Sequence, residues 1–310
     1  MMKDKISVQQ MIKQNQSSNS RGFIEKLIPT ILLIIASVSI LTTIGILITL
    51  LTETITFFSR VSFSEFFLEK EWNAFGKDPK FGIYSLILGT LKVTFIATLF
   101  AVPVGVGAAL YLSEYASDRT RRIVKPILEI LAGIPTIVYG FFALTFVTPI
   151  LRTVWPDLGS FNSISPGLVI GIMVIPMIAS LSEDAMSAVP QAIREGALGL
   201  GSTKLEVALK IVFPAALSGI LASIVLAISR AIGETMIVAL AAGSSPDSTL
   251  SLTSSIQTMT GFIVQVATGD ATYGTDIYYS IYAVGFTLFV FTLIMNFISQ
   301  WVTRRFREEY

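Results

Sequence analysis

The chain contains no cysteine and no histidine among its 310 residues. Without cysteine it can form neither disulfide bonds nor thiolate metal sites, and it has no thiolate nucleophile. Without histidine it lacks the general base of Ser-His-Asp catalysis, the commonest zinc ligand and the usual proton relay. These absences remove the most common enzyme types and predict no metal site, and they leave only catalysis by carboxylates or lysines open.

Charge is also scarce, since only 14% of the residues are charged and the formal net charge is +1. A chain without a strong positive field is not expected to bind nucleic acid. By contrast, 53% of the residues are hydrophobic. A soluble protein of this composition would expose too much apolar surface, so we predict an integral membrane protein whose solvent is the lipid bilayer.

Long apolar runs predict six membrane-spanning helices. The first, Leu27–Leu51, has no charged residue and as a helix would be about 37 Å long, enough to cross a hydrocarbon core of about 30 Å. The other predicted spans are approximately residues 81–112, 127–151, 164–181, 215–243 and 278–302. We therefore predict an all-α integral membrane fold, with a transmembrane domain over residues 27–302 and tails at 1–26 and 303–310.

Positive charge is unevenly divided between the two sides of these spans. Of the 22 Lys and Arg residues, fifteen fall in segments on the side of both termini and five on the opposite side. The positive-inside rule therefore predicts that both termini are cytoplasmic. It places the connector at residues 183–214 in the cytoplasm and the stretch at 244–277 outside. The outer stretch is predicted to be a flexible loop or part of a surface that receives an external binding protein.

The connector at residues 183–214 has the signals of two short helices. Gly201 is predicted to stop the first helix in a left-handed conformation. Thr203, followed three residues later by Glu206, predicts a capping box at the start of the second helix. Pro214 is expected to end that helix or to begin the next span. Two helices hinged at Gly201 could enter a groove on a partner and transmit a push as a rigid body.

Arg230 and Glu234 lie within the fifth predicted span. Arg230 follows Pro214 by 16 residues, which is about 24 Å along a helix. An arginine at that depth costs on the order of 3 kcal/mol, so it should face a cavity or a partner. Glu234 is four residues further on, and we predict that it shares a helix face with Arg230 and pairs with it. The pair is either structural or an anion site on a translocation path, where a guanidinium matches phosphate oxygens.

Lys92 is a further charged residue within a predicted span. We include it as a weaker candidate for the substrate pathway, with snorkelling to the membrane surface or structural pairing as the alternatives. No nucleotide site is predicted. The run Gly199-Leu-Gly-Ser-Thr-Lys204 lacks the Gly-Lys-Ser/Thr order that places a lysine on phosphates. ATP and Mg would therefore be bound by another polypeptide, and this chain is predicted to hold no cofactor.

The connector resembles the EAA loop of the inner-membrane permease subunits of ABC importers, in which the loop is the cytoplasmic surface that docks onto the ATPase. Gly196 stands where that family has a second alanine. The residues that carry the resemblance are Glu195, Gly196, Ala197, Gly201, Ile211 and Pro214. With Thr203 and Glu206 of the capping box, they are the predicted coupling residues.

Two further stretches narrow the resemblance. Ser229-Arg-Ala-Ile-Gly-Glu-Thr-Met236 and Ala132-Gly-Ile-Pro-Thr-Ile-Val-Tyr-Gly-Phe-Phe142 are similar to motifs of permeases of the phosphate-specific (Pst) ABC importers, of the PstC type. The resemblance implies a type I ABC importer permease fold with cytoplasmic coupling helices. It also implies uptake of inorganic phosphate across a prokaryotic inner membrane, with this chain forming half of the pathway.

The implied partners are a PstA-type permease, two PstB-type ATPases and an external phosphate-binding protein. Three alternatives remain open. The chain could carry another oxyanion in the same importer class, or it could be a secondary transporter driven by an ion gradient. It could also be a membrane assembly or signalling protein in which Arg230 and Glu234 form a purely structural pair.

Overall fold

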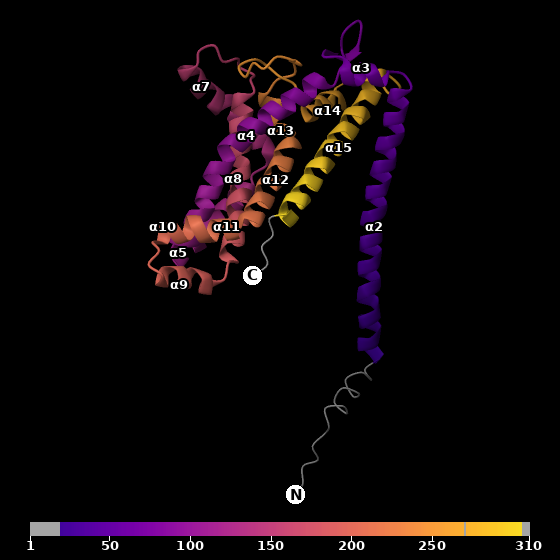
Figure 1. Ribbon diagram of the computed structural model, residues 1–310. Helices are drawn as coiled ribbons and strands as arrows, with labels where there is room; N and C mark the ends of the chain where they lie inside the picture. Colours follow the sequence, from indigo (N-terminus) through magenta and orange to yellow (C-terminus); the bar gives the residue numbers. More distant parts are fainter. Residues whose placement is uncertain (1–18, 270, 306–310) are drawn as a thin grey trace. The chain divides into compact units, whose positions relative to one another are not determined.

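The computed structural model describes residues 19–269 and 271–305 (Figure 1). Most of the predicted N-terminal tail and residues 306–310 of the predicted C-terminal tail lie outside these ranges. The described part is almost entirely helical, which confirms the predicted all-α fold class. The chain divides into two compact units, residues 1–52 and 53–310.

The first unit contains most of helix α2 (Asn19–Phe58). Its segment Leu27–Phe58 is long and apolar enough to cross a membrane. The first predicted span, Leu27–Leu51, lies within this helix. The helix extends past the predicted end at Leu51 because residues 52–58 contain no proline or glycine that would stop it.

The second unit is organised around four long helices, and the first of them passes into a π-helical turn. Helix α8 packs along both α4 and α12, and α15 packs along α12. The elements are α4 (Tyr84–Leu110), the turn η1 (Tyr111–Tyr115), α8 (Ile164–Ser187), α12 (Leu217–Ile232) and α15 (Asp276–Arg305).

Two glycines of α8 allow its close contact with α4. A Cβ atom on Gly167 would lie 2.8 Å from the Ile96 side chain, and one on Gly171 would lie 3.0 Å from the carbonyl oxygen of Ala97. Any larger residue would push the helices apart, which is the known use of small residues four apart in membrane helices. The apolar core at this contact includes Val93, Ala97, Ala101, Val169, Ile170 and Val174.

The start predicted for the third span, residues 127–151, was wrong. The first residues of this range belong to an amphipathic helix, α5 (Asp118–Ala132), which is capped at its C-terminus by Gly133. Pro135 keeps an extended backbone, with φ −57° and ψ 135°, and proline also disfavours a helical residue before it. The span itself covers Thr136–Val154. It is built from α6 (Thr136–Phe142), the π-helical turn η2 (Ala143–Val147) and α7 (Thr148–Val154).

The fifth predicted span, residues 215–243, is also interrupted. Helix α12 ends at Ile232, and after a break at residues 233–235 the chain continues as α13 (Met236–Ala241). The connector helix Lys204–Ala215 meets α12 at an angle of 70°. Among the described residues, five helices could cross a membrane, or six if this bent pair counts as one span.

Within the second unit, the ends of α4, α8 and α12 carry different structures. At one end lie α5 and the connector helices α9 (Gln191–Gly199) and α10 (Lys204–Val207) (Figure 1). At the other end lie α3 (Phe63–Leu68), α7 and α14 (Met259–Thr268). Helix α5 and the connector therefore share a side.

The end opposite the connector has its own aromatic core. A short antiparallel hairpin, β1 (Trp72–Asn73) and β2 (Lys80–Phe81), pairs Trp72 with Phe81. Phe57, Phe66, Trp72, Phe81 and Phe262 are buried together there. Because α14 contributes Phe262 to this core, the stretch at 244–277 is not simply the flexible loop that its composition suggested.

Candidate functional site

The first connector helix, α9, ends as predicted. Gly201 has φ of +90°, the left-handed conformation that glycine adopts without steric cost. Its N–H donates to the carbonyl of Leu198 at 3.0 Å, and the N–H of Ser202 donates to the carbonyl of Ala197 at 3.2 Å. These two bonds form a Schellman motif, which satisfies carbonyl groups at the helix end. The hinge between the two connector helices is therefore a defined turn.

The second connector helix begins with the predicted capping box. The Thr203 N–H donates to Glu206 Oε2 at 3.0 Å, and the Glu206 N–H donates to Thr203 Oγ1 at 3.3 Å. The hydrogen bond from the Thr203 backbone, followed by one from the Lys210 side chain, lowers the pKa of Glu206 to about 2. The helix continues through a π-helical turn, η3 (Ala208–Val212), into α11 (Phe213–Ala215). Pro214 thus lies just before the bend at Ala216.

A small apolar core holds the connector against the membrane helices. Its members come from α4, the end of α8, α9 and the segment from α10 to α12. They are Ala109, Met186, Val189, Ala197, Val207, Val212, Ala216 and Ile220. Ile211 packs against this core and is partly buried. The connector is therefore a packed element that can move with α8 and α12, not a loose loop.

The predicted coupling residues divide into an exposed set and a packed set. Ala197 is buried, while Ile211 and Glu206 are partly exposed. The exposed residues are Glu195, Gly196, Gly201, Thr203 and Pro214. An added Cβ on Gly196 would meet nothing within 4 Å. The departure from alanine at this position is therefore not imposed by packing within this chain.

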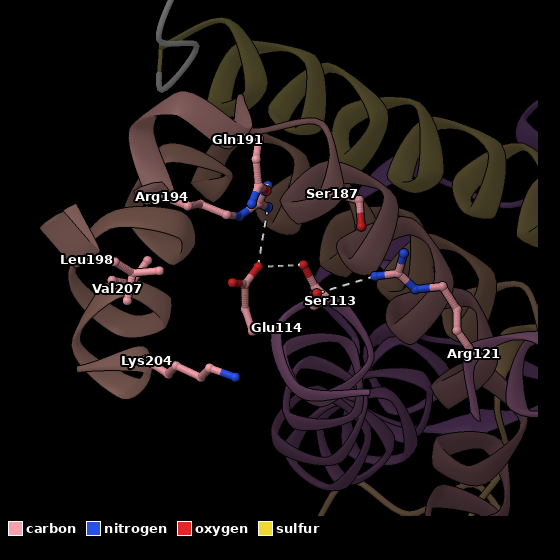
Figure 2. A pocket seen from close by; sticks show the side chains of 9 residues that line it. All are labelled: Ser113, Glu114, Arg121, Ser187, Gln191, Arg194, Leu198, Lys204 and Val207. Atoms are coloured by element: carbon pink, nitrogen blue, oxygen red, sulfur yellow. Dashed lines mark hydrogen bonds and ion pairs between the residues drawn. The ribbon is translucent and has the colours of Figure 1, made fainter. Parts of the chain in front are cut away.

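Arg194 joins α9 to the ends of α8 and η1 (Figure 2). Its Nη2 atom lies 3.2 Å from Oε1 of Glu114. The same atom donates to the carbonyl of Met186 at 2.6 Å, and Nη1 donates to the carbonyl of Val189 at 2.8 Å. These carbonyls lie at the C-terminus of α8, where intrahelical partners run out. In the sequence Arg194 is only one of the positive charges of the connector, and no local pattern links it to Glu114, because 80 residues separate the two.

A second ionic cluster joins α5 to α8 through Glu183. This carboxylate is 1% exposed, lies 3.3 Å from Nε of Arg121 and pairs with Lys125. Ser187 donates a hydrogen bond to it at 2.9 Å. The hydrogen bond to Glu183 raises the pKa of Lys125. The sequence offered only one signal for this cluster, a glutamate near the end of an apolar helix.

Arg230 lies near the end of α12, thirteen residues after Leu217, which is about 20 Å along the helix. Its side chain is exposed. Among the described residues, no hydrogen bond or ion pair involves it. A free guanidinium so far along a membrane helix needs a substrate, a water-filled path or a partner subunit, because lipid cannot stabilise it.

Glu234 does not pair with Arg230, and the predicted shared helix face was wrong. Since α12 ends at Ile232, Glu234 lies in the break and caps the next helix instead. Its buried carboxylate accepts the N–H groups of Met236 at 3.1 Å and Ile237 at 3.3 Å. The Thr260 hydroxyl donates to the Glu234 carbonyl at 2.7 Å. Glycine at position 233 ended the helix where the sequence alone suggested continuity.

Lys92 is 6% exposed and faces the loop that follows α13. Its Nζ donates to the carbonyl of Ser251 at 3.0 Å and lies 4.0 Å from Oδ2 of Asp247. These contacts correspond to the structural pairing considered for Lys92 as an alternative. They hold the loop against α4.

The segment Gly199–Lys204, which has some letters of a phosphate loop, is not arranged as one. Gly199 ends α9, Gly201 makes the left-handed turn and Lys204 begins α10. The element that leads into this segment is a helix and not the strand that a phosphate loop would require. Within residues 19–269 and 271–305, no group of three or more acidic side chains is placed to hold a metal ion.

Comparison with known proteins places these features in a family. Residues 101–308 match the model of the binding-protein-dependent transport system inner membrane component. A phosphate transport system permease protein PstC of Xylella fastidiosa is 36% identical over 76% of this chain and 77% of the relative. The probable ABC transporter permease protein YqgH of Bacillus subtilis is 32% identical over 77% of this chain and 78% of the relative.

Solved structures agree on the fold. The inward-facing methionine ABC transporter MetNI superposes with a TM-score of 0.53 at 18% identity, covering 73% of this chain and 95% of that chain. A bacterial ABC transporter that imports alginate gives a TM-score of 0.55 at 17% identity, covering 85% and 96%. At these identities the likeness concerns the fold alone, and it is that of an ABC importer permease.

Proposed function

Because this chain belongs to the family of binding-protein-dependent transport system inner membrane components, we propose that it is a permease subunit of an ATP-driven importer of inorganic phosphate. As a permease it is not an enzyme, and ATP hydrolysis takes place on a separate subunit. It forms half of the translocation pathway, and a second permease subunit forms the other half.

The observation that carries this proposal is the exposed side chain of Arg230 on a membrane helix, which has no partner in the described part of the chain. A guanidinium offers two parallel hydrogen bonds to a phosphate, and its charge does not depend on pH in the physiological range. The relatives named above include phosphate transport system permease proteins. The chemistry of Arg230 and the names of the relatives therefore agree on the same oxyanion.

We propose that Glu234 acts on this pathway indirectly. As the cap of α13 it fixes the break between α12 and α13, and this break is next to Arg230. Broken helices commonly border binding sites in membrane transporters. Lys92, which is held by Ser251 and Asp247, has the weaker case for contact with the substrate.

The proposed partners follow from the family and from what this chain lacks. A phosphate dianion needs several donors, whereas this chain offers one free arginine at that depth among its described residues, so a PstA-type subunit would supply another. Two PstB-type ATPases would bind ATP and Mg and dock on the connector through Glu195 and its exposed neighbours. An external phosphate-binding protein would deliver the substrate to the opposite end, formed by α3, α7 and α14.

We further propose that the connector end faces the cytoplasm of a prokaryotic cell and that both termini lie on that side of the inner membrane. The excess of Lys and Arg on that side supports this orientation. The shared placement of α5 and the connector at one end of the helices supports it as well (Figure 1).

The test is phosphate uptake by the reconstituted complex, comparing Arg230→Gln with Arg230→Lys and with Arg152→Gln as a control. Arg152 lies in α7 at the end opposite the connector and bonds only to Ser160 among the described residues. We expect Arg230→Gln to lower uptake by about tenfold or more, since a hydrogen bond to a charged group is worth about 1.5–3 kcal/mol. Arg230→Lys should retain part of the activity and Arg152→Gln nearly all of it.

Normal uptake by Arg230→Gln in a fully assembled complex would remove Arg230 from the mechanism. Uptake that competes equally well with sulfate would mean a broader oxyanion permease. Uptake that persists without ATP but collapses with an ion gradient would instead identify a secondary transporter.

A further inference from the structure

A polar pocket of about 420 Å³ opens between the connector helices and the neighbouring elements η1, α5 and α8 (Figure 2). Its lining comes from η1, α5, the end of α8, α9 and α10. The volume falls in the range of about 300–1,000 Å³ that is typical of small-molecule sites. The pocket lies at the connector end of α12, whereas Arg230 lies near the opposite end of that helix and does not line the pocket, so the pocket does not belong to the proposed membrane pathway.

The charges around this pocket favour an anion. Three cations, Arg121, Arg194 and Lys204, line it together with one carboxylate, Glu114. Arg121 is paired with Glu183 and Arg194 with Glu114, so the uncompensated positive charge among the described residues is that of Lys204. That carboxylate is already occupied, because its Oε1 accepts hydrogen bonds from Arg194 at 3.2 Å and from Ser113 at 2.8 Å. Among the remaining polar groups of the lining, the hydroxyls of Ser113 and Ser187 already donate to Glu114 and Glu183, so the free donors are those of Gln191.

Several donors of the lining have no partner in the part of the chain that the structure describes. The side chain of Lys204 is exposed, makes no hydrogen bond or ion pair there, and extends into the open space between α10 and η1 (Figure 2). Nε of Arg194 is buried without a hydrogen-bond partner. Gln191 accepts from Arg194 through Oε1 at 3.5 Å, so its amide N–H groups are left to donate.

We propose that this pocket binds a small anion that carries a phosphate group, and that the bound anion slows the transport cycle. A phosphate group presents several acceptor oxygens and a double charge, which matches the unpaired ammonium of Lys204 and the free amide of Gln191. The anion would tie α9 and α10 to η1 and α5. The connector would then resist any movement relative to α4 and α5.

The binding part of this inference does not depend on what crosses the membrane. The regulatory part rests on the proposed function, because phosphate released on the connector side would then act on the pocket as feedback from the imported product. Two chemically related sources can supply the anion, namely inorganic phosphate itself and a phosphate ester such as AMP.

Binding is tested by protection of a single thiol, which the absence of cysteine from this chain makes possible. Ser187→Cys places the thiol in the pocket lining, and Ala192→Cys places one on the exposed surface of α9, outside the lining. The assembled complex in nanodiscs is labelled with a charged maleimide in chloride, with inorganic phosphate or with AMP. Labelling of the Ser187→Cys chain should slow by about tenfold when the anion is at about ten times its dissociation constant.

The Ala192→Cys chain should label at the same rate in all three solutions. Protection by AMP but not by inorganic phosphate would identify an ester as the ligand. If neither anion protects Ser187→Cys, or if its thiol is unreactive even in chloride because a partner subunit covers it, the proposal is wrong.

Lys204→Gln supplies the charge test, with Lys210→Gln as its matched control. Lys210 is 73% exposed, pairs with Glu206 and does not line the pocket. Protection of Ser187→Cys should weaken by at least about fivefold in Lys204→Gln, as expected for a lost charged hydrogen bond, and should persist in Lys210→Gln. Equal protection in both variants would overturn the assignment of Lys204.

Regulation is measured in proteoliposomes that contain ATP with or without phosphate in the lumen, on the connector side. Each variant is compared with its own rate without luminal phosphate, and that reference rate separately reports the proposed transport function. Luminal phosphate should slow uptake in the unaltered chain and in Lys210→Gln, but much less in Lys204→Gln. Equal slowing in all three would instead reflect product inhibition of the ATPase and would contradict the regulatory role.

Discussion

Replacement of Gly201 by alanine tests whether the connector transmits force as a rigid element. Gly201 has φ of +90°, and an added Cβ would meet no atom within 4 Å. The penalty is therefore purely conformational, about 1–2 kcal/mol for an L-residue in the left-handed region. That is a small part of a typical folding free energy of about 5–15 kcal/mol, yet it shifts a local equilibrium by a factor of about 5–30.

The chain should therefore still insert and assemble, while the Schellman turn opens and the angle between α9 and α10 becomes variable. We expect Gly201→Ala complexes to hydrolyse ATP but to import at least about fivefold less phosphate per ATP. The loss should be this large because the substitution shifts the local equilibrium of the turn by a factor of about 5–30. The assay is initial uptake divided by ATP hydrolysed in proteoliposomes. Gly201→Asn should restore part of the coupling, because asparagine tolerates the left-handed region.

Gly199 provides the matched control. An added Cβ at Gly199 would also meet no atom within 4 Å, but this glycine lies within α9 and does not have a positive φ. Gly199→Ala should stabilise the helix by about 0.5–1 kcal/mol and leave the coupling ratio unchanged. A normal ratio in Gly201→Ala, or an equal loss in both variants, would refute the idea that the left-handed turn sets the geometry of the connector.

Three other outcomes follow from the contacts. The pKa of Glu206 is lowered from 4.5 to about 2. The capping box should therefore stabilise α10 fully above pH 4.5, and this stabilisation should be lost as the pH falls through about 2. Amide hydrogen exchange at α10 as a function of pH would measure the loss. Glu183→Gln should destabilise the contact between α5 and α8 by about 1–3 kcal/mol, measured as a lower melting temperature, with Asp184→Asn, an exposed neighbour, nearly neutral. Lys92→Met should raise protease cleavage in residues 243–258 while leaving uptake largely intact, and a large loss of uptake would return Lys92 to the pathway.

Local signals in the sequence were sufficient to predict the conformation of the connector. Glycine after the last helical residue, threonine three residues before glutamate, and a polar run between apolar segments each have a short-range physical cause. For that reason Gly201, Thr203 and Glu206 were found with the predicted conformations. The all-α membrane fold class could be predicted equally directly, because long apolar runs are typical of membrane-spanning helices.

The breaks within spans were harder to predict. Apolar residues continue on both sides of Gly133–Pro135 and of Gly233–Thr235. A prediction from hydropathy alone therefore treated α5 and α6, and likewise α12 and α13, as parts of one continuous span. In the first case the glycine and proline were visible but were counted as parts of a motif. In the second case Glu234 was assigned to a helix face, although it caps the following helix.

Contacts between distant residues could not be predicted from one sequence. Arg194 meets Glu114 across 80 residues, and Arg121 meets Glu183 only because α5 packs on the end of α8. Both pairs were visible as single charges near span ends. Their pairing depends on how α4, α5 and α8 pack, and that packing depends in part on the close approach at Gly167 and Gly171.

The central claim is that this chain is one of the two permease subunits of an ATP-driven phosphate importer, and it is tested most directly by uptake of labelled phosphate into proteoliposomes holding the complete complex. We predict uptake that requires both the external binding protein and ATP on the connector side, and that falls by about tenfold or more in Arg230→Gln. Uptake that proceeds without ATP would contradict this claim, and uptake that is unchanged in Arg230→Gln would remove Arg230 from the mechanism.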